Sequence, residues 1–131
     1  MGRYNLKLEL KKILEELDIF YKIYLEPTDV EKEKSFPIAW IQLGSESIGD
    51  GDVSASCYMR NISLEIAIGS KHTSTFKPDM DDLLDKVFDA LKTNYTINKT
   101  VINLIPQTIV TDRGYFHPYS LASLIFTVQI R

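Results

Sequence analysis

The chain has little of what membrane insertion, secretion or covalent crosslinking requires. It contains one cysteine, Cys57, which excludes an intramolecular disulfide and favours a reducing compartment. No apolar run approaches the roughly eighteen residues of a transmembrane helix. The start, from Arg3, alternates Leu, Lys and Glu and lacks the apolar core of a signal peptide. We therefore expect a protein made and used inside a cell, without a membrane partner.

Motifs for catalysis and metal binding are also missing. The two histidines, His72 and His117, and Cys57 lie far apart in sequence, with no His-x-x-x-His or Cys-x-x-Cys spacing. No glycine-rich phosphate loop occurs. The Gly-Asp-Gly-Asp stretch around Asp50 and Asp52 lacks the ligand ladder and closing Glu of an EF-hand. The sequence thus predicts no catalytic residue, no cofactor and no metal, and a protein that is not an enzyme.

Length and charge define the class further. A chain of 131 residues, 44% hydrophobic and 25% charged, is expected to form a single domain over residues 1–131. The net charge is −3, and the fifteen Lys and Arg residues are scattered along the chain. Because binding to the phosphate backbone needs clustered basic residues, no sequence-specific nucleic-acid binding is expected.

Two segments have the periodicity of amphipathic helices. From Met80 to Leu91, apolar residues recur at steps of three and four, and the opposite face is rich in Asp and Lys. Asp79, Asp81 and Asp82 suit the start of that helix, where the helix dipole favours negative charge. Arg3–Leu17 has a similar apolar stripe, so both segments are predicted to pack on a sheet.

Five segments have strand character: Ile19–Leu25, Phe36–Leu43, Ser56–Ile68, Leu104–Asp112 and Ser120–Ile130. Polar stretches at 26–35 and 44–56 separate three of them and read as exposed loops. Pro106 places its part of the segment at a sheet edge or at the start of a strand. The predicted fold is α+β, in the order α-β-β-β-α-β-β. Its mostly antiparallel sheet of four to five strands has both helices packed on one side.

This element order resembles the phage tail terminator and tail-completion family, the minor tail protein U-like group. That family similarly opens with a helix, and its middle strand-helix unit resembles Arg60–Leu91. It ends in a hairpin whose last strand is similar to Tyr119–Val128. The segment Asp112–Pro118 resembles the turn before that strand.

The resemblance implies a virion structural protein of the tail, assembled in the host cytoplasm. Such proteins form a homo-oligomeric ring, usually a hexamer, on the end of the tail tube. The ring stops polymerisation of the tube protein and presents a joining surface to the head connector or neck protein.

A ring of identical subunits needs two different, complementary patches on each subunit. Exposed loops and an aromatic tip with no catalytic rationale are the predicted contact regions. The candidate oligomer or partner interface comprises Ser45, Glu46, Asp50, Asp52, Arg60, Arg113, Tyr115, Phe116, His117 and Tyr119.

Two alternatives remain open from the sequence. One is a small ferredoxin-like domain with a ligand-binding or regulatory role, for which a stable dimer with a filled pocket is expected. The other is an enzyme that uses His117. Ring formation would distinguish a tail-terminator-like protein from the first alternative. Loss of activity without loss of assembly in His117→Ala would favour the second.

Overall fold

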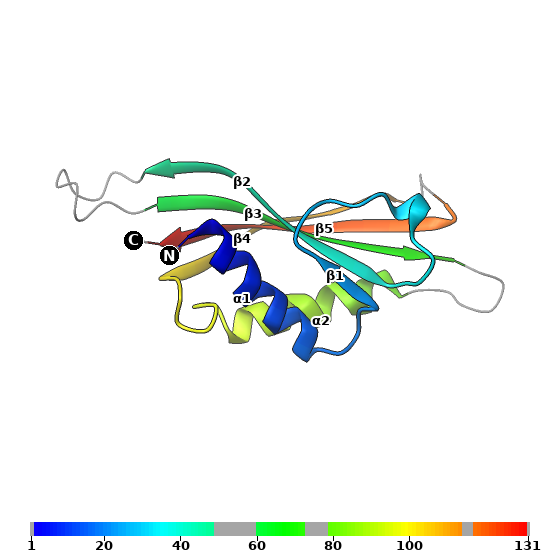
Figure 1. Cartoon of the computed structure of the whole chain (residues 1–131), viewed down its shortest axis with the longest axis horizontal. Coiled ribbons are helices and arrows are strands. Elements are labelled where there is room, and N and C mark those ends of the chain that lie inside the picture. Colours follow the sequence, from blue (N-terminus) through cyan, green and yellow to red (C-terminus); the bar gives the residue numbers. More distant parts are fainter. Residues whose placement is uncertain (1, 49–59, 73–78, 114–116, 131) are drawn as a thin grey trace.

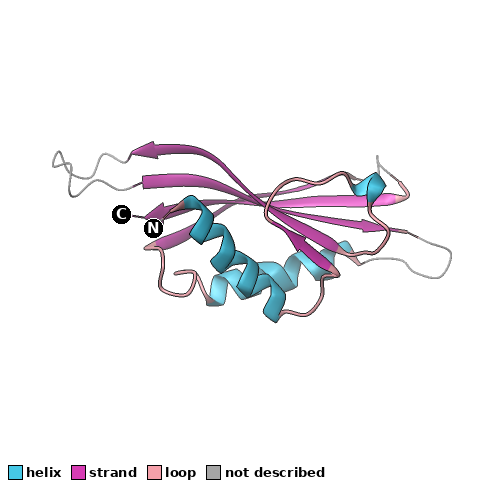
Figure 2. Cartoon of the chain, viewed as in Figure 1, coloured by secondary structure: helices cyan, strands magenta, loops and turns pink. Residues whose placement is uncertain are grey.

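The computed structural model describes residues 2–48, 60–72, 79–113 and 117–130. Its elements are α1 (Arg3–Glu16), β1 (Lys22–Tyr24), the 3₁₀ turn η1 (Val30–Lys32), β2 (Ile38–Ile48), β3 (Arg60–Lys71), α2 (Met80–Thr93), β4 (Asn103–Thr111) and β5 (Tyr119–Ile130). The five strands form one sheet, and both helices lie on the same face of it (Figure 1; Figure 2). The predicted α+β class and element order are confirmed.

The sheet has the strand order β1-β2-β3-β5-β4, so β1 and β4 are its edges. The pairs β2–β3, β3–β5 and β4–β5 are antiparallel, whereas β1 and β2 are parallel. The prediction of antiparallel pairing between neighbouring segments is therefore wrong for this pair. The connection over residues 25–37, which includes η1, is long enough to return the chain to the same end of the sheet.

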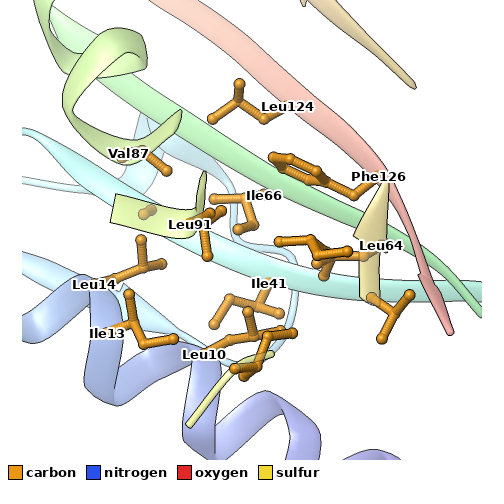
Figure 3. Close-up of a cluster of buried hydrophobic side chains, with 14 of the residues drawn as sticks. Leu10, Ile13, Leu14, Ile41, Leu64, Ile66, Val87, Leu91, Leu124 and Phe126 are labelled. Atoms are coloured by element: carbon orange, nitrogen blue, oxygen red, sulfur yellow. The ribbon is translucent and has the colours of Figure 1, made fainter. Parts of the chain in front are cut away.

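One face of the central strand β3 forms the middle of the core. Its alternate residues Ile62, Leu64, Ile66 and Ile68 are fully buried. Figure 3 shows Leu64 and Ile66 among side chains from α1, α2 and the neighbouring strands, including Phe126. Strand alternation thus delivers every second side chain to the helix-covered face.

Both helices begin at the predicted residue and end within two residues of the predicted segments. The Asp79 carboxylate caps α2 by accepting a hydrogen bond from the Asp82 amide at 3.0 Å. After α1, Asp18 adopts a left-handed backbone (φ 53°), the conformation that ends many helices at glycine. On α1, Lys12 pairs with Glu9 at 3.1 Å and not with Glu16 as its spacing also allowed. Neither described helix is long and apolar enough to span a membrane.

Three strands differ from the predictions by three residues or more at one described end. β3 continues to Lys71, beyond the predicted end at Ile68. β1 covers only Lys22–Tyr24 of the expected strand Ile19–Leu25. β2 continues through residues 44–48, which the sequence places in a loop. Their polar side chains gave no strand pattern, but the backbone pairs with β3, Glu46 opposite Ile62, after an irregularity between Leu43 and Glu46.

The β1–β2 connection covers part of the face of the sheet that the helices leave open. Ile38 on that face is fully buried. At Gly69, opposite Ile38, an added Cβ would lie 2.9 Å from the Val30 side chain and 3.5 Å from Leu121. The absence of a side chain at Gly69 therefore lets the η1 turn pack directly on the sheet.

We predict that Gly69→Ala lowers the free energy of unfolding by about 1–3 kcal/mol, because the new methyl group overpacks this contact. Urea denaturation gives the value. The double variant Gly69→Ala, Val30→Ala should recover most of the loss. Gly44→Ala is the matched control, since its Cβ would meet Ser63 at an ordinary 3.4 Å. Equal losses in both single variants would contradict the explanation.

Candidate functional site

The edge strand β4 is the most exposed strand of the described chain. Its residues from Pro106 to Thr111 are all exposed, and Ile109 and Val110 keep 50% and 51% of their surface accessible. The segment Asn103–Thr111 contains no charged residue. Proteins usually protect an edge strand with charged side chains, a short length or a covering segment. In β4, the main feature that hinders pairing with another chain is the irregularity between Pro106 and Thr108.

The backbone of β4 also has hydrogen-bonding groups directed away from the sheet. The Asp112 amide donates to the Leu121 carbonyl at 3.0 Å. Because hydrogen-bonded and non-hydrogen-bonded positions alternate in an antiparallel pair, the groups of Ile109 and Thr111 point to the free edge. Another extended strand or a polar side chain could pair with them.

An apolar groove runs beside this edge, between α2 and β4. It has a volume of about 340 Å³, and its apolar wall is formed by Phe88, Leu91, Tyr95, Leu104, Pro106 and Phe126. A second hollow of about 230 Å³ continues from Phe88 toward Ile109. The rings of Phe88 and Phe126 stack with centroids 6.4 Å apart, which holds the floor of the groove in place.

The turn after α2 closes one end of the groove. Ile97, Asn98 and Lys99 all have positive φ, between 48° and 65°, a costly conformation for residues other than glycine. The Asn94 and Asn98 side chains hold the turn: Asn94 donates to the Asn98 side-chain oxygen at 2.7 Å and accepts from the Asn98 amide at 2.8 Å. Tyr95, which lines the groove, is 53% exposed in this turn.

A hydrogen bond ties this turn to α1. The Asn98 side-chain amide donates to Glu9 at 2.9 Å. That bond, together with Lys12, lowers the pKa of the Glu9 carboxyl from its usual value. The contact joins residues that are distant in sequence, so no local pattern indicates it.

Three of the predicted interface residues gather at one end of the sheet. Glu46 on β2 forms ion pairs with Arg60 on β3 and with Arg3 on α1, the latter at 3.2 Å. Hydrogen bonds from Arg60 and then Arg3 lower the pKa of the Glu46 carboxyl from its usual 4.5. The Arg3 guanidinium also donates to the Gly44 carbonyl at 2.8 Å. Ser45, exposed beside them, lies in the irregular part of β2.

The other described interface residues lie at the opposite end. Arg113 is exposed in the turn after β4, with φ 53°. His117 is exposed before β5, and Tyr119 begins that strand and pairs with Lys71. From Arg60 to Lys71 the strand β3 spans roughly 36 Å at about 3.3 Å per residue. The predicted residues thus form two separate groups; Asp50, Asp52, Tyr115 and Phe116 lie outside the described residues.

The two histidines, distant in sequence, meet at this second end. Their ring centroids are 5.3 Å apart, and His72 Nε2 lies 3.0 Å from Ser120 Oγ. A serine beside a histidine is one part of a nucleophilic site, which also needs a group that orients the histidine. Within the described ranges no group of three or more His, Cys, Asp or Glu side chains could hold a metal ion.

Sequence reasoning missed the edge and the groove as a functional surface. Pro106 gave a correct signal for the edge position of β4. Phe88 belonged to the apolar stripe of α2 and was therefore assigned to the core. Its exposure to a groove depends on where the sheet ends, which periodicity does not specify.

Comparisons with known proteins find similarity among solved structures and none at the level of sequence. No protein-family model and no curated protein matches the sequence. Among solved structures, a chain of the "Virion of native gene transfer agent (GTA) particle" aligns with a TM-score of 0.48 and 9% sequence identity. The alignment covers 95% of this chain and 92% of that chain. A likeness at this level carries no functional assignment.

We predict that the ion pairs of Glu46 stabilise the fold in a pH-dependent way. Because its pKa is lower in the folded state, the contribution is present above the unfolded value near 4.5 and is lost as the pH falls through the folded pKa. Glu46→Gln should therefore lower the urea midpoint at about pH 7, and the difference from wild type should shrink toward about pH 3.5. Glu16→Gln, which removes a carboxylate from the exposed surface of α1, is the matched control and should lower the urea midpoint at about pH 7 less than Glu46→Gln does.

Proposed function

We propose that this protein is a virion structural subunit that assembles as an oligomeric ring, caps a phage tail tube and forms the head–tail joining surface. The observation that carries the proposal is the charge-free, exposed edge β4 beside an apolar groove. An exposed, uncharged edge strand promotes association with other chains. Monomeric proteins usually prevent this association with charged side chains or a covering segment.

The edge of the sheet opposite β4 is partly covered by other segments of the chain. This difference between the two edges supports an assembly in which unlike surfaces meet. β1 pairs only with residues 38–40 of β2. Further along β2, the Arg3 guanidinium donates a hydrogen bond to the Gly44 carbonyl. A charged side chain on an edge discourages strand addition. The two edges are therefore unlike, and unlike surfaces are what a ring of identical subunits needs.

The proposal includes no catalytic activity. The Ser120–His72 contact at 3.0 Å is a partly buried hydrogen bond that joins the residue after β3 to the neighbouring strand β5. His117 beside it is exposed and, with Tyr119, forms part of the end of the sheet that could face a partner. The roles of the tail tube and the head connector as partners rest on the resemblance in element order.

Native mass spectrometry with negative-stain imaging over a range of concentrations tests the proposal, in the absence and presence of purified tail tubes. A closed ring, free or on tube ends, is the expected result. A protein that stays monomeric and leaves tube ends unbound would overturn the proposal. A stable dimer with a filled pocket would instead favour a ligand-binding domain.

We predict that Ile109→Lys weakens assembly about tenfold or more, because it places an unpaired charge on the β4 edge. The fold should be unaffected, since this side chain is 50% exposed. Oligomer populations by native mass spectrometry and urea midpoints give the two readouts. Ile109→Val, which keeps an apolar β-branched residue, is the matched control and should assemble like wild type. Normal assembly of the lysine variant would exclude β4 from the interface.

A further inference from the structure

The face of the sheet that holds the core becomes polar at the end where β3 finishes and β5 begins (Figure 1). On β3, the buried residues Ile62 to Ile68 are followed on the same face by Ser70 and then His72. On β5, Ser120 pairs with Ser70. Ser70 is fully buried, and its hydroxyl has no hydrogen-bond partner among the described residues. Because buried hydroxyls normally have a partner, this end of the face suits a polar ligand or a water bound to one.

A second imidazole reaches this polar end from the turn before β5. The ring centroids of His72 and His117 are 5.3 Å apart, with the ring planes inclined at 45°. The His72 amide donates to the Pro118 carbonyl at 2.7 Å, which extends the β3–β5 pairing as far as the neighbour of His117. His72 is half-buried and His117 is exposed. The sheet thus fixes the backbone beside both imidazoles and leaves the pair accessible from solvent.

The separation of the two rings agrees with that of two imidazoles bound to one metal ion. A zinc ion lies about 2.0–2.1 Å from each ligating nitrogen, and the nitrogen lies about 1.2 Å from the centre of its ring. At a tetrahedral angle, the centroids of the two rings are then about 5.2 Å apart. Neutral imidazole is a common ligand of Zn²⁺, Ni²⁺ and Cu²⁺. The distance and the donor type therefore both fit a transition-metal ion of this class.

Ser120 lies where it can orient one of these ligands. Its Oγ is 3.0 Å from His72 Nε2. A histidine that binds a metal through one ring nitrogen almost always donates its other N–H to a nearby oxygen. When Nε2 donates to Ser120, the lone pair of His72 is on Nδ1, where a metal can bind. The Ser120 hydroxyl is thus placed to fix the tautomer and the ring orientation of His72.

We propose that His72 and His117 together bind one transition-metal ion of the class Zn²⁺, Ni²⁺ or Cu²⁺. His72 binds through Nδ1, and Ser120 acts as a positioning residue. Two protein ligands make an open site, in contrast to the four of a structural zinc centre, so water completes the coordination. The buried Ser70 hydroxyl, paired across the sheet with Ser120, is available to bind such a water. The site shares no residue with the groove beside β4 and goes beyond the proposed ring.

Metal titration of the full chain without a histidine tag tests the pair of ligands. Calorimetry with Zn²⁺ should show one ion bound per chain. The chain has only these two histidines, so His72→Ala and His117→Ala should each weaken binding about tenfold or more. Cys57→Ser is the control, because it removes the one thiol and should leave binding unchanged. Binding that either alanine variant retains at wild-type strength, or that Cys57→Ser loses, would overturn the inference.

The imidazole ligands can be counted directly with Cu²⁺. Pulsed electron paramagnetic resonance with one equivalent of Cu²⁺ should detect two imidazoles in the wild type and one in each alanine variant. A merely structural role of the histidines would not produce this change, and a single imidazole in the wild type would overturn the inference. Urea midpoints without metal report whether each variant is folded. His117→Ala should keep the wild-type midpoint, because this side chain is exposed.

Substitution of Ser120 tests its positioning role. Ser120→Ala should weaken Zn²⁺ binding about tenfold or more, the usual effect of removing a group that orients a metal ligand. Ser120→Thr keeps the hydroxyl and, since threonine is favoured in strands, should bind like wild type. Equal losses in the two variants, or no loss in Ser120→Ala, would contradict this role.

The outcomes separate this inference from the proposed function. Rings formed by a protein that binds no metal through its histidines would overturn the metal site alone. A metal bound by both histidines of a protein that forms no ring, in solution or on tube ends, would support the metal site and overturn the proposed function alone.

Discussion

The burial of one face of β3 is the constraint on which the rest of this structure depends. Its four large side chains on that face have no exposed surface, and both helices are needed to cover them and their neighbours (Figure 3). With α1 and α2 committed to one face, an open sheet of five strands keeps two edges. Those edges must be protected within the chain or covered by a partner. The exposed edge that we propose as the assembly surface is thus a consequence of how the core is built.

Much of this arrangement could be predicted from the sequence, because it follows from local periodicity. The alternation from Ile62 to Ile68 and the helical stripe of Met80–Leu91 each encode one buried face. The parallel β1–β2 pair could not be predicted, since the direction of a strand depends on the path of the connection over residues 25–37 and not on its own side chains. The strand at residues 44–48 was missed for a related reason: its pairing with β3 uses backbone groups, which every sequence supplies.

The candidate site was less predictable, because its parts come from distant segments. Loop composition led to Glu46, which meets the predicted residue Arg60, but the ion pairs that Glu46 forms with Arg60 and Arg3 join elements within the chain and hold the β2 edge in place. The groove forms because Phe88 of α2 lies beside the edge strand β4, where Pro106 forms part of the opposite wall. Only the end of the sheet, a property of the whole fold, leaves that aromatic ring partly open to a partner.

The form of β4 also bears on the kind of contact it can make. Pro106 has no amide hydrogen, and the irregularity between Pro106 and Thr108 interrupts the regular pattern, so the outward backbone groups nearest the exposed apolar residues are those of Ile109 and Thr111. An added strand would therefore gain few hydrogen bonds. The groove beside it offers an aromatic wall whose burial is worth more, at about 25 cal/mol per Å² of apolar surface. A side chain seated in the groove, with limited strand pairing beside it, is consequently the contact that this edge favours.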